Sequence, residues 1–211
     1  KTKLIALSAA ALLATGCATT ISDEEAHSKA VALMKAGFKD RGQAKVDRID
    51  QDKLQRLCSS YESNPIPKDV AAQIEKEQLA TIKYPADGKF LGDWKEGEKI
   101  AQSGRGLTWT DKADDANGGN CYNCHQMDKK EISCGNLGPS LYNYGKLRGV
   151  SDPNAAASKA IVEYTWGKLW NSRAYNACSQ MPRAGHKGIL SEKNLKDVMA
   201  LLLDPKSPVN Q

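Results

Sequence analysis

The sequence lacks several features that define common classes of protein. It has no block of Lys and Arg residues and no alternation of basic with aromatic residues, so a nucleic-acid groove is not indicated. The formal net charge is only +5 over 211 residues. Neither an internal repeat of fixed period nor a low-complexity run is present. With 40% hydrophobic residues, the composition is typical of a soluble globular protein.

Ligands for a structural zinc ion are also scarce. Cys121 and Cys124 form a CxxC pair, but no second CxxC or HxxxH pair exists, and a structural zinc site needs four such ligands. A thioredoxin-like dithiol is another alternative, which requires a strand-like segment before the pair. Residues 111–120, DKADDANGGN, read instead as a polar loop. Both alternatives are weaker than the one that the following histidine suggests.

The stretch CYNCH, residues 121–125, has the spacing of a c-type haem attachment motif. In such a motif the two cysteine sulfurs bond to the two vinyl groups of one haem, and the next histidine binds its iron. The sequence therefore predicts one covalently bound haem c, held by Cys121 and Cys124, with His125 as an iron ligand.

The start of the chain is consistent with export. Lys1 and Lys3 precede the apolar stretch LIALSAAALLATGC. This stretch is too short to span a bilayer comfortably. We expect residues 1–18 to be a signal peptide and the mature protein to be periplasmic. Two outcomes stay open: lipidation of Cys17 after cleavage behind Gly16, which would tether the protein to a membrane, or cleavage near Ala18 with no anchor.

Helical patterns divide the rest of the chain near residue 88. The pattern in residues 19–88 predicts an N-terminal helical extension, whose first helix is capped by Ser22. In residues 89–211, Asp93 and Ser191 can cap the first and the last helix. Gly97 leaves a shallow surface against which the closing helix can cross closely. An all-α fold is expected, and its helices around a covalently held haem resemble a class I cytochrome c domain, covering residues 89–211.

A second axial ligand for the iron is best supplied by Met181, in the loop QMPRAGH, 56 residues after His125. A thioether favours Fe(II) and raises the potential relative to a second histidine, and the next residue, Pro182, stiffens the loop. A packing or surface role for Met181 is the alternative. Met127 is too close to His125 in sequence, and Met199 falls on the apolar face of the last helix.

The stretch LGPSL, residues 137–141, matches a further feature of cytochromes c. There, a Gly-Pro pair presents a backbone carbonyl to the second nitrogen of the iron-binding histidine, and Pro139 occupies that position. The alternative is a simple turn, which both residues favour.

Four cysteines lie outside the CxxCH motif. Cys134 and Cys178 fall in the two loops expected to approach the haem, which predicts a Cys134–Cys178 disulfide in an oxidising periplasm. Cys58 would then be unpaired, either buried or bonded to another chain, if Cys17 is lipidated or removed.

Three stretches together resemble the SoxX family, the monohaem subunits of the SoxAX cytochromes of bacterial thiosulfate oxidation. These are CYNCH, SCGNLGPSLYNYG and ACSQMPRAGHKGILSEKNLKDVMALLLD. The helical extension is similar to that of the longer SoxX variants, so the resemblance spans the mature chain.

The resemblance implies an electron-transfer subunit of an L-cysteine S-thiosulfotransferase. Its partners would be a haem-bearing SoxA subunit, the SoxYZ carrier reached through the complex, and a small cytochrome c as electron acceptor. Thiosulfate coupling would take place on SoxA, so no catalytic residue is expected in this chain. The alternatives are a stand-alone or lipid-anchored electron carrier and, beyond that, a haem sensor or peroxidase-like enzyme.

Overall fold

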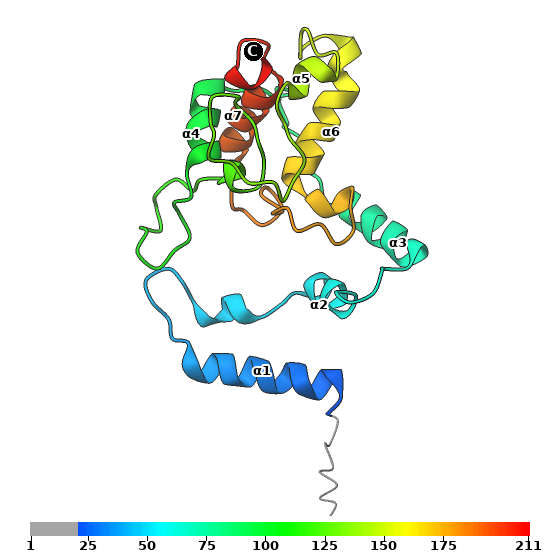
Figure 1. Ribbon diagram of the computed structural model, residues 1–211, viewed down its shortest axis with the longest axis vertical. Helices are drawn as coiled ribbons and strands as arrows, with labels where there is room; N and C mark the ends of the chain where they lie inside the picture. Colours follow the sequence, from blue (N-terminus) through cyan, green and yellow to red (C-terminus); the bar gives the residue numbers. More distant parts are fainter. Residues whose placement is uncertain (1–20) are drawn as a thin grey trace, which may run out of the picture. The chain divides into compact units, whose positions relative to one another are not determined.

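The computed structural model describes residues 21–211, and every regular element in that range is a helix. The α-helices are α1 (Asp23–Gly37), α2 (Lys53–Ser60), α3 (Lys68–Leu79), α4 (Trp94–Gln102), α5 (Tyr144–Leu147), α6 (Lys159–Trp170) and α7 (Glu192–Leu203) (Figure 1). Short 3-10 helices are η1 (Val46–Ile49), η2 (Cys121–Asn123), η3 (Ala156–Ser158), η4 (Ser172–Ala174) and η5 (Pro208–Asn210). The all-α class is confirmed.

Two predictions concern residues that the structure does not describe. The signal peptide, residues 1–18, and the lipidation site Cys17 both lie outside the described range. Within residues 21–211, none of the helices is both long enough and apolar enough to cross a membrane.

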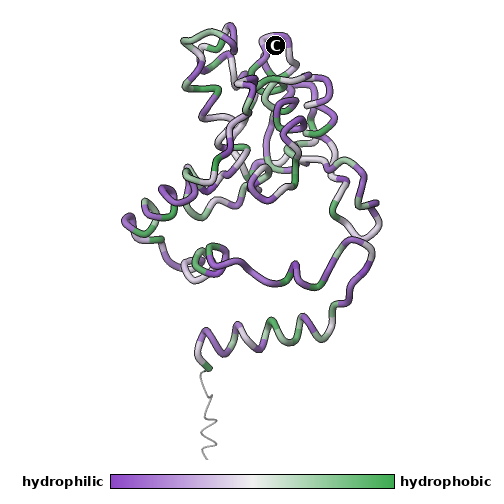
Figure 2. Tube along the Cα trace, turned by 180° about the vertical axis from the view of Figure 1, so that it is seen from behind, coloured by the Kyte–Doolittle hydropathy of each residue, from purple (hydrophilic) through white to green (hydrophobic). Residues whose placement is uncertain are grey.

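Contacts within the chain divide it into two compact units, residues 1–39 and residues 40–211. The described part of the first unit holds α1, where the Ser22 hydroxyl oxygen accepts a hydrogen bond from the Glu25 backbone N–H at 3.2 Å. This is the predicted N-cap. Figure 2 shows hydrophobic and hydrophilic residues alternating along α1, but none of its side chains is buried.

The larger unit is built around a close crossing of α4 and α7, the helices that the sequence predicted to pack together. A Cβ atom at Gly97 would lie only 2.2 Å from the Asp197 carbonyl oxygen and 3.1 Å from the Leu201 Cβ. Only a glycine therefore allows this approach, and Ala101, one turn further on, is completely buried. Asp93 and Ser191 both accept the predicted capping hydrogen bonds.

Helix α7 supplies most of the core of this unit. Its Val198, Met199 and Leu201 are buried, and Trp166 from α6 joins the same hydrophobic cluster. The full burial of Met199 agrees with the packing role that its place in the helical pattern predicted.

Residues 40–88 belong to the same compact unit as residues 89–211. The indole N–H groups of Trp166 and Trp170 donate to the carbonyls of Lys83 at 2.8 Å and Thr81 at 3.1 Å, which fixes the chain after α3 against α6. The contact-based boundary between the compact units falls after Lys39, within the segment expected as an extension.

Candidate functional site

The CxxCH motif forms one tight turn at η2. The backbone N–H groups of Cys124 and His125 both donate to the carbonyl of Cys121, at 3.1 and 2.9 Å. Asn120, immediately before the turn, has a φ of 48°, a left-handed conformation that Asn tolerates better than most residues. Two thiols and one imidazole thus come from a single turn of backbone.

His125 makes the hydrogen bond that the Gly-Pro pair predicted. Its Nδ1 lies 2.7 Å from the carbonyl oxygen of Pro139. A carbonyl only accepts hydrogen bonds, so Nδ1 carries the proton and the lone pair of Nε2 is left to bind a metal. The structure thus contains the hydrogen bond that the Gly-Pro pair predicted, and Nε2 is the nitrogen that this bond leaves free.

Gly138 has a steric role that the sequence reasoning missed. A Cβ atom at this position would lie 2.2 Å from Cε1 and 2.6 Å from Nδ1 of His125. The imidazole therefore rests directly against the glycine backbone. The Gly-Pro pair in the sequence predicted the position of the proline carbonyl. It did not predict the contact between the glycine backbone and the imidazole.

A polar contact fixes the other side of the turn on α4. The Tyr122 hydroxyl donates to the Glu98 carboxylate at 2.9 Å and accepts from the Asp128 backbone N–H at 3.2 Å. Burial raises the pKa of both Tyr122 and Glu98. Tyr122 therefore keeps its proton at neutral pH and can donate to Glu98.

The electrostatics of Cys121 bear on the dithiol alternative. Desolvation by the surrounding protein raises the pKa of its thiol to about 11. Thiol–disulfide exchange requires a thiolate, and redox-active CxxC pairs lower the pKa of one cysteine. The environment of Cys121 is the opposite of the one that such chemistry needs.

Met181 lies in the loop between η4 and α7, partly buried against the hydrophobic core. Its backbone carbonyl accepts a hydrogen bond from the Ser172 hydroxyl at 2.6 Å, and its N–H donates to the Ser179 hydroxyl at 3.2 Å. Met127, by contrast, is a buried core residue. The Asn117 side chain donates to the Ile189 carbonyl at 2.9 Å, which joins the loop before the CxxCH turn to the loop after Met181.

The predicted Cys134–Cys178 disulfide is wrong. Cys178 is bonded to Cys58, with the two Cα atoms 5.5 Å apart, so Cys58 is not unpaired either. Cys134 is exposed and free. The backbone N–H of its neighbour Gly135 donates to the Tyr122 carbonyl at 2.8 Å. This bond folds the Cys134 loop onto its own turn, while α2 lies beside Cys178.

A signal for the observed pairing was present in the sequence. Cys58 shares a helical face with Leu54 and Leu57, a pattern that predicts packing of that face against another part of the chain. The prediction of a Cys134–Cys178 bond rested instead on the two loops expected to surround a haem, and Cys58 lies in neither of them.

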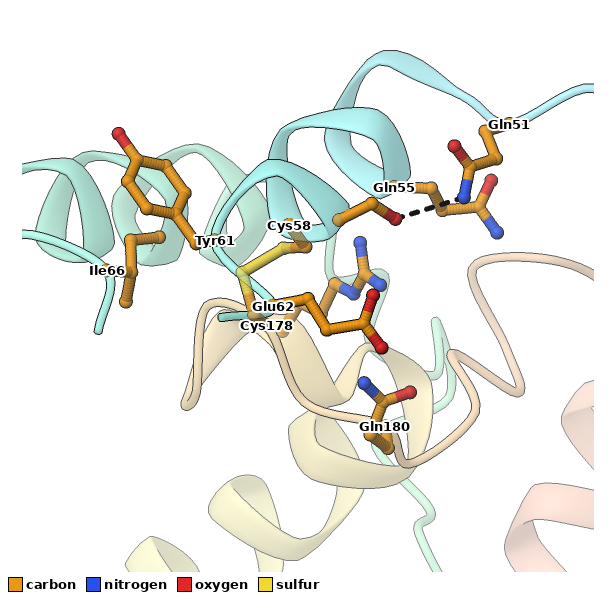
Figure 3. Close-up of a pocket in the computed structure, with 10 residues that line it drawn as sticks. Gln51, Gln55, Cys58, Tyr61, Glu62, Ile66, Cys178 and Gln180 are labelled. Carbon is orange, nitrogen blue, oxygen red and sulfur yellow. Dashed lines mark hydrogen bonds between the residues drawn. A yellow bond between two sulfur atoms is a disulfide. The ribbon is translucent and has the colours of Figure 1, made fainter. Parts of the chain in front are cut away.

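A cavity of about 470 Å³ lies beside the disulfide, between α2 and the segment from Arg173 to Gln180. Figure 3 shows Cys58 joined to Cys178, with Gln55, Glu62 and Gln180 around the opening. The other lining residues are Gln51, Ser59, Tyr61, Ile66 and Arg173. The cavity is mainly polar, and no sequence pattern predicted it.

An ion pair connects the start of α2 with the Met181 loop. The Asp52 carboxylate accepts hydrogen bonds from the Arg183 guanidinium at 2.6 Å and lies 2.8 Å from the Lys187 ammonium group. Burial alone would raise the pKa of Asp52, but the hydrogen bonds from Lys187 and Arg183 outweigh it and lower the pKa. Asp52 therefore remains ionised at neutral pH.

Within residues 21–211, no three His, Cys, Asp or Glu side chains lie close enough together to share a metal ion. The most specific site in this all-α protein is the CxxCH turn. No family model matches the sequence.

The chain is similar to an uncharacterized lipoprotein from Aquifex aeolicus (strain VF5). The two are 40% identical over 166 residues, which cover 76% of this chain and 73% of that protein. The chain belongs to the family of this lipoprotein.

Proposed function

We propose that this chain is a monohaem c-type cytochrome that transfers electrons as the SoxX-like subunit of a SoxAX-type complex. The observation that carries the proposal is the hydrogen bond between His125 Nδ1 and the Pro139 carbonyl, because it leaves Nε2 of the imidazole free on the same turn as two unpaired cysteines. Class I cytochrome c architecture for residues 89–211 is part of the proposal.

The residues fit a covalently held haem. Cys121 and Cys124 would hold the porphyrin through thioether bonds, and His125 through Nε2 and Met181 through its thioether would supply the iron ligands. When bound, haem supplies a one-electron Fe(III)/Fe(II) couple. The Pro139 carbonyl would keep the imidazole oriented and increase its basicity.

If His125 and Met181 both bind the iron, electron transfer would be the favoured activity, since a substrate would have to displace Met181. Electrons would pass from a SoxA-like haem subunit to a small cytochrome c. Coupling of thiosulfate to the SoxYZ carrier would take place on the partner subunit.

Export to the periplasm is part of the same proposal, since haem c attachment and the Cys58–Cys178 disulfide both suit an oxidising compartment. The relative in Aquifex aeolicus is named a lipoprotein, which supports a lipid anchor on Cys17. Mass spectrometry of the protein purified from membranes would show the mass of an acylated Cys17 or its absence.

A stand-alone, lipid-anchored electron carrier is the second candidate. A heterodimer would explain an extension that needs a partner to cover it, but α2 and the segment after α3 already pack within residues 40–211. Purification from a source that also produces SoxA separates the two candidates: a stable complex of two haem subunits supports the first, and a monomer supports the second.

The haem itself is tested by the absorption spectrum and mass of the exported protein. We expect the α-band of a c-type haem and one haem mass, both lost in Cys121→Ala/Cys124→Ala. Cys134→Ser, which removes an exposed free thiol, is the matched control and should retain the haem. A wild-type protein without covalent haem would disprove the proposal.

A further inference from the structure

Two attachments hold the segment around Met181, and both lead to α2. Cys178, three residues before Met181, is bonded to Cys58. Arg183, two residues after Met181, pairs with Asp52 at 2.6 Å. Asp52 is the N-cap of α2, and Cys58 lies within that helix. One short helix therefore holds the methionine loop on both sides of the methionine.

The charged attachment is buried on its arginine side. The side chain of Arg183 is only 8% exposed and that of Asp52 is 32% exposed. The second oxygen of the Asp52 carboxylate accepts from the Gln55 backbone N–H at 2.8 Å. One carboxylate thus starts α2 and anchors the loop, and its loss would leave the guanidinium of Arg183 buried without its ion-pair partner.

The backbone of Met181 is supported from the other side by α3 and the chain after it. The buried Ser172 hydroxyl donates to the Met181 carbonyl at 2.6 Å. The neighbouring Asn171 side chain donates to Gln78 at 3.0 Å and to the Thr81 hydroxyl at 2.8 Å. The chain from α3 to Thr81 therefore holds Asn171, which is the neighbour of the Ser172 that bonds to the backbone of Met181.

The cavity lies against one of the two attachments. It is lined by Cys58 and Cys178 and by other residues of α2 and of the segment 173–180. The disulfide therefore joins two surfaces that have open space between them. Together with the Asp52–Arg183 pair, it connects α2 to the loop on both sides of Met181.

We propose that Asp52 and the Cys58–Cys178 disulfide are positioning residues, which hold the thioether of Met181 at the iron as its sixth ligand. This inference rests on the proposed function. When only a fraction of the molecules has Met181 in place, an external ligand competes more effectively for the vacated position. Loosening either attachment lowers that fraction, although neither residue contacts the iron.

The test compares carbon monoxide binding to the reduced full-length holoprotein in three variants. Cys58→Ser/Cys178→Ser removes the disulfide without leaving a lone thiol. Asp52→Asn removes the charge but retains a side-chain oxygen that can cap α2. Met181→Leu leaves the sixth position open in every molecule and sets the fastest binding.

Cys58→Ser/Cys178→Ser and Asp52→Asn are called the clamp variants below. We expect both to bind carbon monoxide on the order of tenfold faster than the wild type, the usual size of such coupling. In the oxidised protein, the weak absorption band of iron–methionine ligation should decrease in parallel. Asp52→Glu, which restores the carboxylate, should return both signals toward wild type. The disulfide variant should have the larger effect of the two.

Two controls match the variants chemically. Cys134→Ser removes a cysteine that has no disulfide partner, and Glu163→Gln removes the carboxylate of an exposed pair with Lys159 at 3.8 Å. Both should bind carbon monoxide as slowly as the wild type. Far-UV circular dichroism checks folding, and Asp52→Asn still tests the inference if the cysteine variant does not fold.

The outcomes separate this inference from the proposed function. If Met181→Leu binds carbon monoxide rapidly while both folded clamp variants behave as the wild type, the positioning role is disproved and the haem ligation stands. If Met181→Leu changes neither the spectrum nor carbon monoxide binding, Met181 is not a ligand and both proposals fail. Rapid binding in the clamp variants, together with slow binding in Cys134→Ser and Glu163→Gln, supports the inference.

Discussion

Around His125, hydrogen bonds join residues that are close in sequence, whereas around Met181 the attachments cross most of the chain. The bond from His125 to Pro139 spans 14 residues. The Cys58–Cys178 bond spans 120 residues and the Asp52–Arg183 pair spans 131. A short stretch of sequence can therefore specify the histidine side of the proposed site, but the methionine side requires the fold to form first.

Loss of the disulfide is the change with the largest expected effect on stability. Cys58→Ser/Cys178→Ser opens a loop closed over 120 residues, for which the chain-entropy model gives about 5 kcal/mol. Chemical denaturation measures the loss. Hydrogen exchange should show that residues 175–190 lose protection before residues 119–139 do, and equal loss in both segments would contradict the comparison.

A matching change on the histidine side is Gly138→Ala. The new methyl group would lie 2.2 Å from Cε1 of His125, so the imidazole or the Pro139 turn must move, at a cost of about 1–3 kcal/mol. The midpoint temperature of thermal unfolding and the yield of covalent haem should both decrease. Gly149→Ala offers a comparison, because nothing lies within 4 Å of its added Cβ, although its φ of 71° adds backbone strain of its own.

The sequence was sufficient wherever a feature depended on neighbouring residues. The CxxCH turn, the caps at Ser22, Asp93 and Ser191, and the proline carbonyl opposite His125 all follow from short patterns. The crossing at Gly97 also followed, because small residues at helical spacing leave a shallow surface. The structure agrees with each of them.

The disulfide could not be predicted in the same way. Four cysteines outside the motif allow several pairings, and only the three-dimensional path of the chain decides between them. The expected pairing treated residues 19–88 as separate from the site, whereas the disulfide joins α2 to the loop of Cys178 within one compact unit. The cavity and the Asp52–Arg183 pair were missed for the same reason, since each joins residues more than a hundred positions apart.

Acid should weaken the methionine side through Asp52. Its pKa is lower in the folded protein than the value of about 3.9 expected in the unfolded chain, so its contribution to stability is present above about pH 4 and is lost as the pH falls further. Arg183 and Lys187 bond to the carboxylate, and Arg173 and His186 also interact with it electrostatically.

Asp52→Asn should therefore cost about 1–2 kcal/mol at neutral pH, because a largely buried guanidinium loses its ionic partner. The difference from wild type should shrink below about pH 4, where Asp52 takes up a proton in the unfolded wild-type chain but remains ionised in the folded protein. Urea denaturation at several pH values measures this. A difference that stays constant down to acid pH would show that the lost charge is not the cause.

The smallest expected effect is that of Lys187→Ala, and it isolates what makes the Asp52 pair strong. Lys187 lies 2.8 Å from Asp52, nearly as close as Arg183, but its side chain is 43% exposed while that of Arg183 is 8% exposed. Exposed pairs contribute up to about 1 kcal/mol because water and salt screen them. We expect a loss below that value which disappears in high salt, whereas the loss in Asp52→Asn persists. An equal, salt-sensitive loss in the two variants would mean that surface attraction, and not the buried guanidinium, holds the methionine loop to α2.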